Sequence, residues 1–429
     1  MIDKDHFTRN IVLNLSGQVI PFGIAFFSIP KLISGLGINR FGILSLSWMI
    51  IGYFSLFDLG LGRALTKLVA EKLGTGKDAD LPFLIWTGLI SMTGLGLTGV
   101  LIGIPWISWA VQSGFNIPPD LQPETRHAFC ILLLSIPLVI ISTGLFGIIE
   151  AYHRFDISSG IRAGLGIYTF AAPLAGLQFT TDISHIVWIL MAGRSLAGAV
   201  LFACCIRLVP QLRWTFGFRR DLFMSLIRFG SWMTVSNLIS PLMVYVDRFW
   251  ISATISVAAV AFYTTPFEVV TRLLIIPGAI AGVLYPAFSM KLIQDPVGVK
   301  RLYKNGILYI FVTIFPIVMI IIIFAGRGLR WWLDAEFEKN SVHVLQWLSV
   351  GVLFNSLAQI PFVLLQGTGR PDITAKIHLI ELPCYLLLLW FLISVKGIEG
   401  AGIAWCARSM MDACLLFVMA NRYVWNIFR

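Results

Sequence analysis

The sequence predicts an all-α integral membrane protein of about twelve transmembrane helices in two six-helix bundles that repeat each other. Three observations predict this fold. Hydrophobic residues make up 57% of the 429 residues and charged residues only 13%, with a mean hydropathy of +0.84, whereas soluble domains carry about 25% charged residues. Most charges fall between apolar stretches long enough to cross a bilayer. The two halves of the chain also share sequence segments in the same order.

Apolar runs bounded by charges, proline or glycine define the helices, because about 20 residues are needed to cross the hydrocarbon core. The predicted spans are 10–34, 41–66, 82–108, 128–150, 157–179 and 184–207 in the first half, then 226–251, 257–288, 304–326, 342–367, 373–395 and 398–421 in the second. No connecting segment is long enough to hold a catalytic domain. The sequence therefore argues against an enzyme with an active site outside the membrane.

The distribution of Lys and Arg predicts the orientation in the membrane. Lys and Arg number 32 against 22 Asp and Glu, a net charge of +10. Twenty of the basic residues fall on the side that holds both termini and eight on the opposite side. Because cytoplasmic loops are enriched in Lys and Arg, both termini are expected in the cytoplasm. No compact basic patch with interleaved aromatic residues is present, so no nucleic-acid partner is predicted.

An internal repeat covers about half of the chain. The segments GIIEAYHRFDIS, with Arg154, and VLLQGTGRPDIT, with Arg370, lie 216 residues apart, and the segments around Arg194 and Arg408 match at an offset of 214. Each repeat contains six predicted helices, and an even number returns the chain to its starting side. The sequence therefore predicts two bundles of the same orientation, at 1–215 and 216–429, related by a pseudo-two-fold axis along the membrane normal, as in many transporters.

Three segments resemble the Wzx-type polysaccharide-repeat (O-antigen) flippases of the multidrug/oligosaccharidyl-lipid/polysaccharide exporter superfamily. IPKLISGLGINRFGIL (Ile29–Leu44) is similar to the family's link between helices one and two. LFDLGLGRALTKLVAE (Leu56–Glu71) is similar to the end of its helix two, with an Asp-Leu-Gly core and trailing basic residues. VDRFWISATISVAAVAFY (Val246–Tyr263) places an aspartate and a tyrosine at family-like positions.

The resemblance implies a transporter that moves an undecaprenyl-pyrophosphate-linked oligosaccharide from the cytoplasmic to the periplasmic leaflet of the bacterial inner membrane. It implies two six-helix lobes with a cavity lined by helices one, two, seven and eight. The expected partners are the lipid-linked oligosaccharide, the bilayer and enzymes of polysaccharide assembly. The sequence predicts no cofactor and no metal site. The implied mechanism is alternating access coupled to an ion gradient, so a coupling proton or sodium ion is the small ligand expected.

Arginines at membrane depth are the candidate substrate-binding residues. A charge near the bilayer centre costs about 2.5–3.5 kcal/mol on insertion scales, so such residues usually face a partner or a wet cavity. Arginine suits a pyrophosphate because its planar guanidinium binds phosphate oxygens in pairs and keeps its charge. In order of preference, the candidates are Arg272, Arg248, Arg63, Arg194 and Arg408.

Acidic residues at membrane depth are the candidate ion-coupling residues. Asp58 lies in the Asp-Leu-Gly segment of helix two, where it could bind an ion or only pack within the turn. Asp247 and Glu268 are the other candidates. Glu268 precedes Arg272 by four residues, the favourable order for an ion pair within one helix, and that pair could be purely structural. Arg408 and Asp412 have the same spacing in the reverse order.

Three other functions remain open from the sequence. A cation-coupled drug or metabolite exporter of the same superfamily would share the twelve helices, but should present an acidic, aromatic pocket. A membrane-embedded glycosyltransferase or polymerase should carry a large periplasmic loop or clustered carboxylates, and neither is visible in the sequence. A non-transporting scaffold is disfavoured by the charges at membrane depth.

Overall fold

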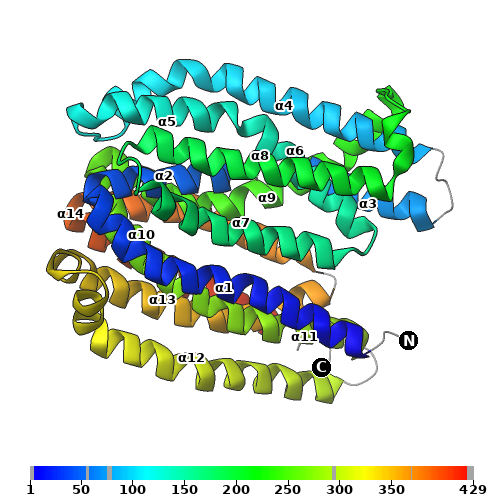
Figure 1. Cartoon of the computed structure of the whole chain (residues 1–429). Coiled ribbons are helices and arrows are strands. Elements are labelled where there is room, and N and C mark those ends of the chain that lie inside the picture. The colour runs from blue at the N-terminus through cyan, green and yellow to red at the C-terminus, as the bar shows by residue number, and fades with distance from the viewer. Residues whose placement is uncertain (1–3, 55–57, 75–79, 292–295, 369, 423–429) are drawn as a thin grey trace. The chain divides into compact units, whose positions relative to one another are not determined.

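The computed structural model describes residues 4–54, 58–74, 80–291, 296–368 and 370–422. Every regular element in these ranges is a helix (Figure 1), which confirms the predicted all-α class. The chain divides into two compact units, Met1–Tyr245 (unit 1) and Val246–Arg429 (unit 2). The division falls within one continuous helix, α9 (Arg220–Thr254). The predicted boundary between residues 215 and 216 stays a prediction, because it follows the sequence repeat and the observed division follows packing.

Unit 1 is a bundle built around one helix, α6, which packs against α3, α4 and α8, while α1 packs along α7. Small residues on α6 allow the close approach. A Cβ atom added at Gly144 would lie 2.6 Å from Met92 Sδ of α4, and one added at Gly147 would lie 3.0 Å from the carbonyl oxygen of Gly62 in α3. The helices are α1 (Lys4–Leu36), α2 (Ile38–Phe54), α3 (Leu61–Gly74), α4 (Leu81–Trp109), α5 (Gln122–Leu134), α6 (Ile136–Ala151), α7 (Phe155–Gly176) and α8 (Ile183–Leu208), with the short turns η2 (Ala110–Gly114), η3 (Pro119–Leu121) and η4 (Pro210–Arg213).

Unit 2 is a second bundle, in which α13 is central and packs against α10, α11, α12 and α14. Its hydrophobic core joins α11 to α14 through buried side chains that include Phe288, Val299, Ile310, Ile314, Ile360, Leu364, Ile377 and Leu416. The helices are α10 (Val257–Thr271), the short turn η5 (Arg272–Leu274), α11 (Ile275–Lys291), α12 (Pro296–Trp332), α13 (Ala335–Gly367) and α14 (Pro371–Ala420).

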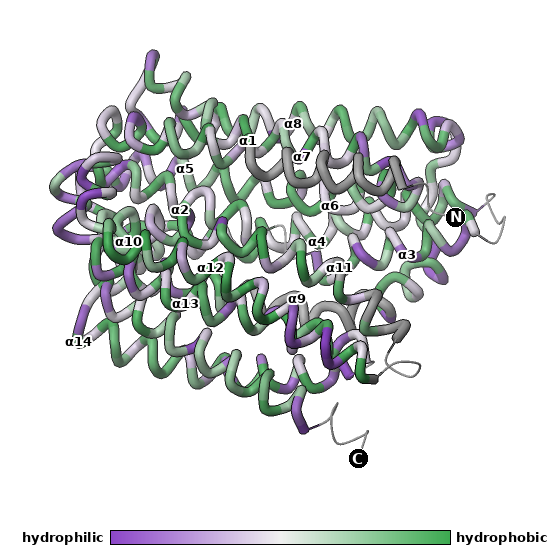
Figure 2. The backbone as a smooth tube through the Cα atoms, turned by 90° about the horizontal axis from the view of Figure 1, so that it is seen from below, coloured by the Kyte–Doolittle hydropathy of each residue, from purple (hydrophilic) through white to green (hydrophobic). Residues whose placement is uncertain are grey.

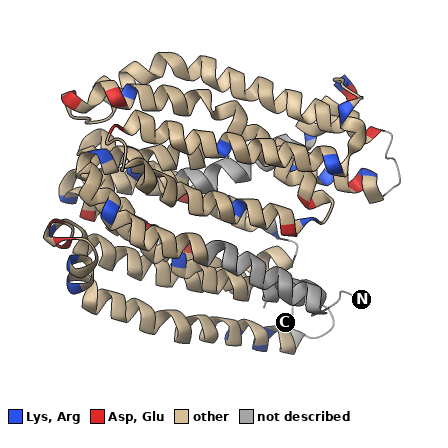
Figure 3. Cartoon of the chain, viewed as in Figure 1, with Lys and Arg blue, Asp and Glu red and all other residues tan. Residues whose placement is uncertain are grey.

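The length and the exposed hydrophobic residues of the helices are those of a membrane protein. Seven helical segments of the described residues are long and apolar enough to cross a bilayer: 81–114, 119–151, 183–208, 257–282, 297–332, 335–367 and 372–420. Hydrophobic residues run along the helices (Figure 2), and in unit 1 the charged residues gather toward helix ends (Figure 3). Helix α12 exposes large apolar side chains along its length, among them Leu308, Phe311, Val312, Phe315, Ile320, Ile323 and Phe324. Such a face is unfavourable in water and suits contact with lipid tails.

Each predicted span overlaps a helix, but three spans are split. Span 41–66 is divided between α2 and α3, span 128–150 between α5 and α6, and span 257–288 between α10 and α11. Prolines explain two of these breaks, because proline lacks an N–H and cannot donate to the carbonyl four residues earlier. Pro137 follows the break at Ser135, and Pro277 follows the tighter turn η5. Apolar runs reveal that a membrane is crossed but not where a helix breaks within it.

The last two predicted spans, 373–395 and 398–421, are the two halves of α14. They are separated at Gly397, which is the one residue of this helix with non-helical backbone angles, φ 60° and ψ −137°. Side chains rarely permit a positive φ, so glycine is the residue suited to this position. The chain therefore changes direction at Gly397, and residues of the first half of α14 come opposite residues of the second half.

The internal repeat is visible in the geometry of one corner in each unit. Between α6 and α7, Arg154 donates through Nε and NH2 to Asp156 at 3.0 and 2.9 Å. Between α13 and α14, Arg370 donates in the same way to Asp372 at 2.9 and 3.1 Å. The backbone N–H groups of both arginines donate five residues back, at 3.1 and 3.0 Å. The hydrogen bond from Arg154 holds the pKa of Asp156 below its usual range, so this pair is charged at neutral pH.

Candidate functional site

A chain of alternating acidic and basic side chains in unit 2 brings together four of the predicted site residues. This arginine–acid chain consists of Asp247 and Arg248 of α9, Glu268 of α10 and Arg272 of η5. Arg248 NH1 lies 3.6 Å from Asp247 Oδ1, and Arg248 NH2 lies 3.8 Å from Glu268 Oε1. The other oxygen of Glu268 accepts a hydrogen bond from Arg272 NH2 at 3.2 Å. The carboxylate of Glu268 thus lies between two guanidinium groups.

The inner end of the arginine–acid chain, at Asp247 and Arg248, is buried and makes hydrogen bonds and a ring contact. Asp247 is completely buried, and its carboxylate accepts hydrogen bonds from the hydroxyl of Tyr263 at 2.5 Å and from the N–H of Arg248 at 2.7 Å. The guanidinium of Arg248 also stacks on the ring of Phe267, 4.2 Å from the centroid. The turn between α9 and α10 sets this geometry, because Ser256 caps α10 through the N–H of Ala259 at 3.1 Å.

The outer end of the arginine–acid chain is accessible to solvent. The side chains of Arg272 and Glu268 are 35% and 41% exposed, whereas that of Arg248 is only 2% exposed. The predicted ion pair between Glu268 and Arg272 is present. Of the two preferred substrate-binding candidates, Arg272 is therefore the one whose guanidinium is accessible, and the guanidinium of Arg248 lies buried behind Glu268.

Asp58 lies in the turn between α2 and α3 rather than inside a continuous helix. One carboxylate oxygen accepts the N–H of Gly60 at 2.9 Å, and the other accepts the N–H of Gly62 at 3.0 Å. The hydroxyl of Thr143 in α6 lies 3.3 Å from the second oxygen. Leu59 and Gly60 have positive φ angles of 49° and 71°. These contacts are those of a side chain that caps the start of α3.

The other three candidate arginines are not brought together with the arginine–acid chain by any ion pair among the described residues. Arg63 is an exposed residue of α3, and Arg194 is a partly buried residue in the middle of α8. Arg408, in the second half of α14, is buried and lies 5.7 Å from the ring centroids of both Tyr385 and Trp405. Within the described part of the chain, Arg408 makes no ion pair within 4.0 Å with Asp412, despite their four-residue spacing.

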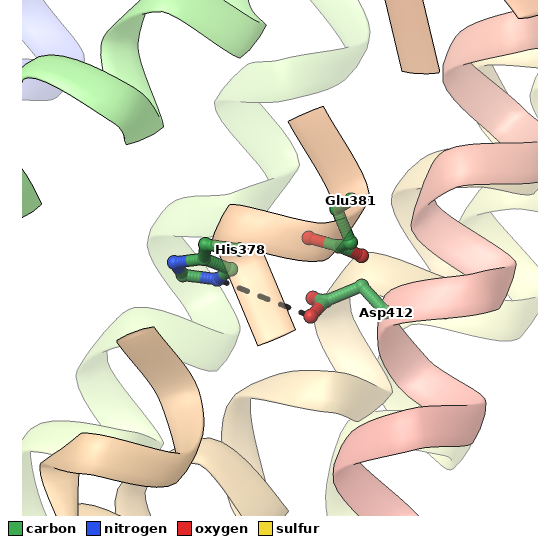
Figure 4. A group of neighbouring side chains, drawn as sticks. All are labelled: His378, Glu381 and Asp412. Atoms are coloured by element: carbon green, nitrogen blue, oxygen red, sulfur yellow. Dashed lines mark ion pairs between the residues drawn. The ribbon is translucent and has the colours of Figure 1, made fainter. Parts of the chain in front are cut away.

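A second polar group in unit 2 includes a residue that sequence reasoning missed. His378, Glu381 and Asp412 form a histidine–carboxylate cluster, in which one ligand atom of each residue lies within 4.8 Å of the others. Figure 4 shows the three side chains converging from two parts of α14. The three-residue spacing of His378 and Glu381 places them on one helix face, and this signal was available in the sequence. The sequence did not indicate that Asp412 lies beside these two residues, because that placement depends on the change of direction at Gly397.

Comparisons with known proteins identify the family. The model of the family described as "Polysaccharide biosynthesis protein" matches residues 7–291. A protein of Shigella flexneri described as "Putative O-antigen transporter" is 33% identical over 422 residues, which cover 95% of this chain and 96% of the relative. The chain belongs to the polysaccharide biosynthesis protein family. An uncharacterised membrane protein of Bacillus subtilis, EpsK, is 23% identical over 83% of this chain and 70% of its own length.

Solved structures show the fold of this polysaccharide biosynthesis family member. An inward-facing multidrug resistance transporter of the MATE family and MOP superfamily is similar with a TM-score of 0.79 and 12% identity, over 97% of this chain and 98% of that one. A MOP superfamily transporter from Pyrococcus furiosus is similar with a TM-score of 0.66 and 13% identity, over 98% and 95% of the two chains. The fold is that of a MOP superfamily transporter. With the family match, this makes the chain a membrane transporter and not an enzyme.

Proposed function

We propose that this transporter flips an undecaprenyl-pyrophosphate-linked oligosaccharide from the cytoplasmic to the periplasmic leaflet of the bacterial inner membrane, in a cycle coupled to an ion gradient. The observation that carries the proposal is the match to the Shigella flexneri relative, which extends over nearly the full length of both chains. That relative is described as an O-antigen transporter, and an O-antigen unit is a polar sugar that cannot cross a bilayer unaided.

The arginine–acid chain supplies chemistry that suits a pyrophosphate. Glu268 offers one oxygen to Arg248 and the other to Arg272, so its carboxylate occupies the position where an anionic group would meet two guanidinium groups. A phosphate that displaces Glu268 would gain charge-assisted hydrogen bonds from planar donors, which bind phosphate oxygens in pairs. The partial exposure of Arg272 and Glu268 makes this exchange possible without unpacking Asp247.

The decisive test is transfer of the lipid-linked sugar in proteoliposomes that contain only the purified chain. Wild-type protein should move the substrate to the opposite leaflet, where an added sugar-specific lectin or glycosidase reaches it. Arg272→Ala should reduce the rate at least tenfold and Arg272→Lys should recover part of it, because lysine keeps the charge but not the planar pair of donors. Arg327→Ala is the matched control, since Arg327 is an exposed arginine of unit 2 outside the arginine–acid chain.

Two results would contradict the proposal. Wild-type protein that leaves the lipid-linked sugar in its original leaflet would refute the substrate. Full transfer by Arg272→Ala at matched incorporation would refute the role of the arginine–acid chain. Arg248→Ala is a poor first test, because removal of this buried guanidinium would leave the buried carboxylate of Asp247 without its cation and cost stability as well as binding.

A further inference from the structure

The histidine–carboxylate cluster of unit 2 is separate from the arginine–acid chain and is built by the fold of α14. His378 and Glu381 lie in the first half of this helix and Asp412 in the second half, on either side of Gly397. The Nε2 atom of His378 faces Oδ1 of Asp412 at 4.0 Å (Figure 4). The three side chains point toward one another, so they present one imidazole nitrogen and two carboxylates to the same small space.

Three carboxylate oxygens of this cluster are buried without a hydrogen-bond partner among the described residues. Glu381 is completely buried, and within the described ranges neither of its carboxylate oxygens has a hydrogen-bond partner. Oδ1 of Asp412 also has none, and the residue is 7% exposed. Burial of an ionised carboxylate without a partner is strongly unfavourable, and such a group either acquires a proton or binds a cation. The geometry therefore points to a positively charged ligand.

The charged groups around the cluster show how much positive charge is needed. Arg408 interacts electrostatically with all three members of the cluster and with Asp247. From α13, the ring of Phe362 stacks on His378 with centroids 6.2 Å apart. The neighbouring ionisable groups are Tyr385 of α14, Asp247 and Arg248 of α9, and Tyr263 of α10. The buried carboxylates of Glu381, Asp412 and Asp247 carry three negative charges, and the buried guanidinium groups of Arg408 and Arg248 carry two positive charges. Glu268, which also pairs with Arg248, is offset by Arg272. With neutral imidazole, the group lacks one positive charge.

We propose that His378, Glu381 and Asp412 form a proton-binding site inside unit 2. A single proton supplies the one missing charge, whereas a divalent metal ion would leave an excess positive charge in the same buried place. An alkali cation prefers oxygen ligands, and a ring nitrogen is more typical of transition metals. Histidine is also the side chain whose ordinary titration range includes neutral pH. Exposure of the side chains falls from 24% at His378 to 10% at Asp412, and Glu381 is fully buried, which gives a proton an entry point.

The role of this site in transport rests on the proposed function, because the proton would be the coupling ion of the flipping cycle. Proton binding itself does not rest on it. The three acidic candidates from the sequence already have partners, Asp58 in a capping turn and Asp247 and Glu268 in the arginine–acid chain. In the part of the chain that the structure describes, the buried carboxylate oxygens without a hydrogen-bond partner belong to the histidine–carboxylate cluster.

The test is the pH dependence of stability for the purified full-length chain in lipid nanodiscs. If the folded state binds a proton that the unfolded chain does not, the free energy of unfolding falls as the pH rises. The thermal unfolding midpoint of wild-type protein should therefore fall as the pH is raised from about 5 to about 8, the range that includes the ordinary titration of histidine. Glu381→Gln, which is permanently neutral, should lose most of this dependence. Asp412→Asn and His378→Gln provide two further variants if Glu381→Gln does not fold.

Glu399→Gln is the matched control, because Glu399 is a carboxylate of the same helix outside the cluster, where it accepts a hydrogen bond from Trp347. It should keep the wild-type pH dependence. A wild-type pH dependence in all three cluster variants would overturn the proposal. So would sodium-dependent stabilisation at constant pH that Glu381→Gln abolishes, since the ligand would then be sodium. If a chelator lowered the stability of the wild-type protein but not that of Glu381→Gln, the ligand would be a metal ion and the proposal would also be overturned.

Transport measurements separate this inference from the proposed function. With the lipid-linked sugar in proteoliposomes, an imposed proton gradient should change the wild-type flipping rate and leave the rate of Glu381→Gln unchanged. A wild-type chain with proton-linked stability that flips no lipid-linked sugar would refute the proposed function and leave the proton site standing. A wild-type chain that flips the sugar but shows neither proton-linked stability nor a response to the gradient would refute the proton site alone.

Discussion

Asp58 shows that an aspartate in an apolar stretch can either bind an ion or cap a helix. Both oxygens of its carboxylate accept N–H groups at the start of α3, from Gly60 and Gly62. The turn requires these bonds, because Leu59 and Gly60 adopt positive φ angles and the first N–H groups of a helix have no partner within it. The position of Asp58 in an apolar sequence could not distinguish the two roles, since the donors belong to the backbone.

We therefore predict that Asp58→Asn mainly lowers stability. Asparagine keeps one acceptor oxygen and loses the other, so the loss should be about 1 kcal/mol, and Asp58→Ala should cost up to about 2 kcal/mol. Thermal unfolding in nanodiscs measures this change. In proteoliposomes, Asp58→Asn should still respond to an ion gradient. Loss of that response with unchanged stability would instead make Asp58 the coupling residue.

At the residue scale, sequence reasoning located the charges and the partner one helical turn away, but not the partners that come from other helices. The pair of Glu268 and Arg272 follows from helical spacing and is present. The burial of Arg248 between Asp247 and Glu268 depends on the turn at Ser256, which no periodicity predicts. His378 was not among the predicted site residues, and only the change of direction at Gly397 brings Asp412 opposite it.

At the scale of the elements, the helices of unit 1 are held together by close contacts between small residues. On α6, Gly147 faces Thr66 and the carbonyl oxygen of Gly62 of α3. In a bilayer, where apolar burial between helices gains little over contact with lipid, such close packing is a main source of association. A side chain on α6 at this place would have to push the two backbones apart.

We predict that Gly147→Val destabilises unit 1 by about 1–3 kcal/mol, the usual cost of overpacking. The thermal unfolding midpoint should fall, and proteolysis between α3 and α4 should become faster. Gly160→Ala is the control on α7, because no described atom lies within 4 Å of a Cβ atom added there. A midpoint for Gly147→Val equal to that of Gly160→Ala would show that α3 and α6 are free to separate.

The existence of the helices followed from apolar length, since a bilayer-spanning segment must satisfy its own backbone hydrogen bonds. The breaks within them did not. Ser135 and the turn at Arg272–Leu274 interrupt continuous apolar runs, so hydropathy is the same on both sides. Prolines at 137 and 277 were visible signals, but proline is also tolerated inside membrane helices, as Pro21 and Pro105 are here.

At the scale of the whole molecule, the orientation predicted from Lys and Arg remains to be measured. The six native cysteines are all free thiols, so they can be replaced without loss of a disulfide. In that background, a cysteine at the exposed position of Arg220 should resist a membrane-impermeant maleimide in intact cells, because the 208–225 segment is expected in the cytoplasm. A cysteine in place of exposed Gly328 should react. Ready labelling at Arg220 would reverse the topology.

The corner shared by Arg154 with Asp156 and by Arg370 with Asp372 has a consequence for how the two bundles divide their work. At the repeat offsets of 216 and 214, the counterparts of His378, Glu381 and Asp412 are Arg162, Leu165 and Gly198. The scaffold is therefore duplicated, but the ionisable cluster is not. The proposed proton site therefore belongs to unit 2, and the corresponding positions of unit 1 carry no matching set of a histidine and two carboxylates.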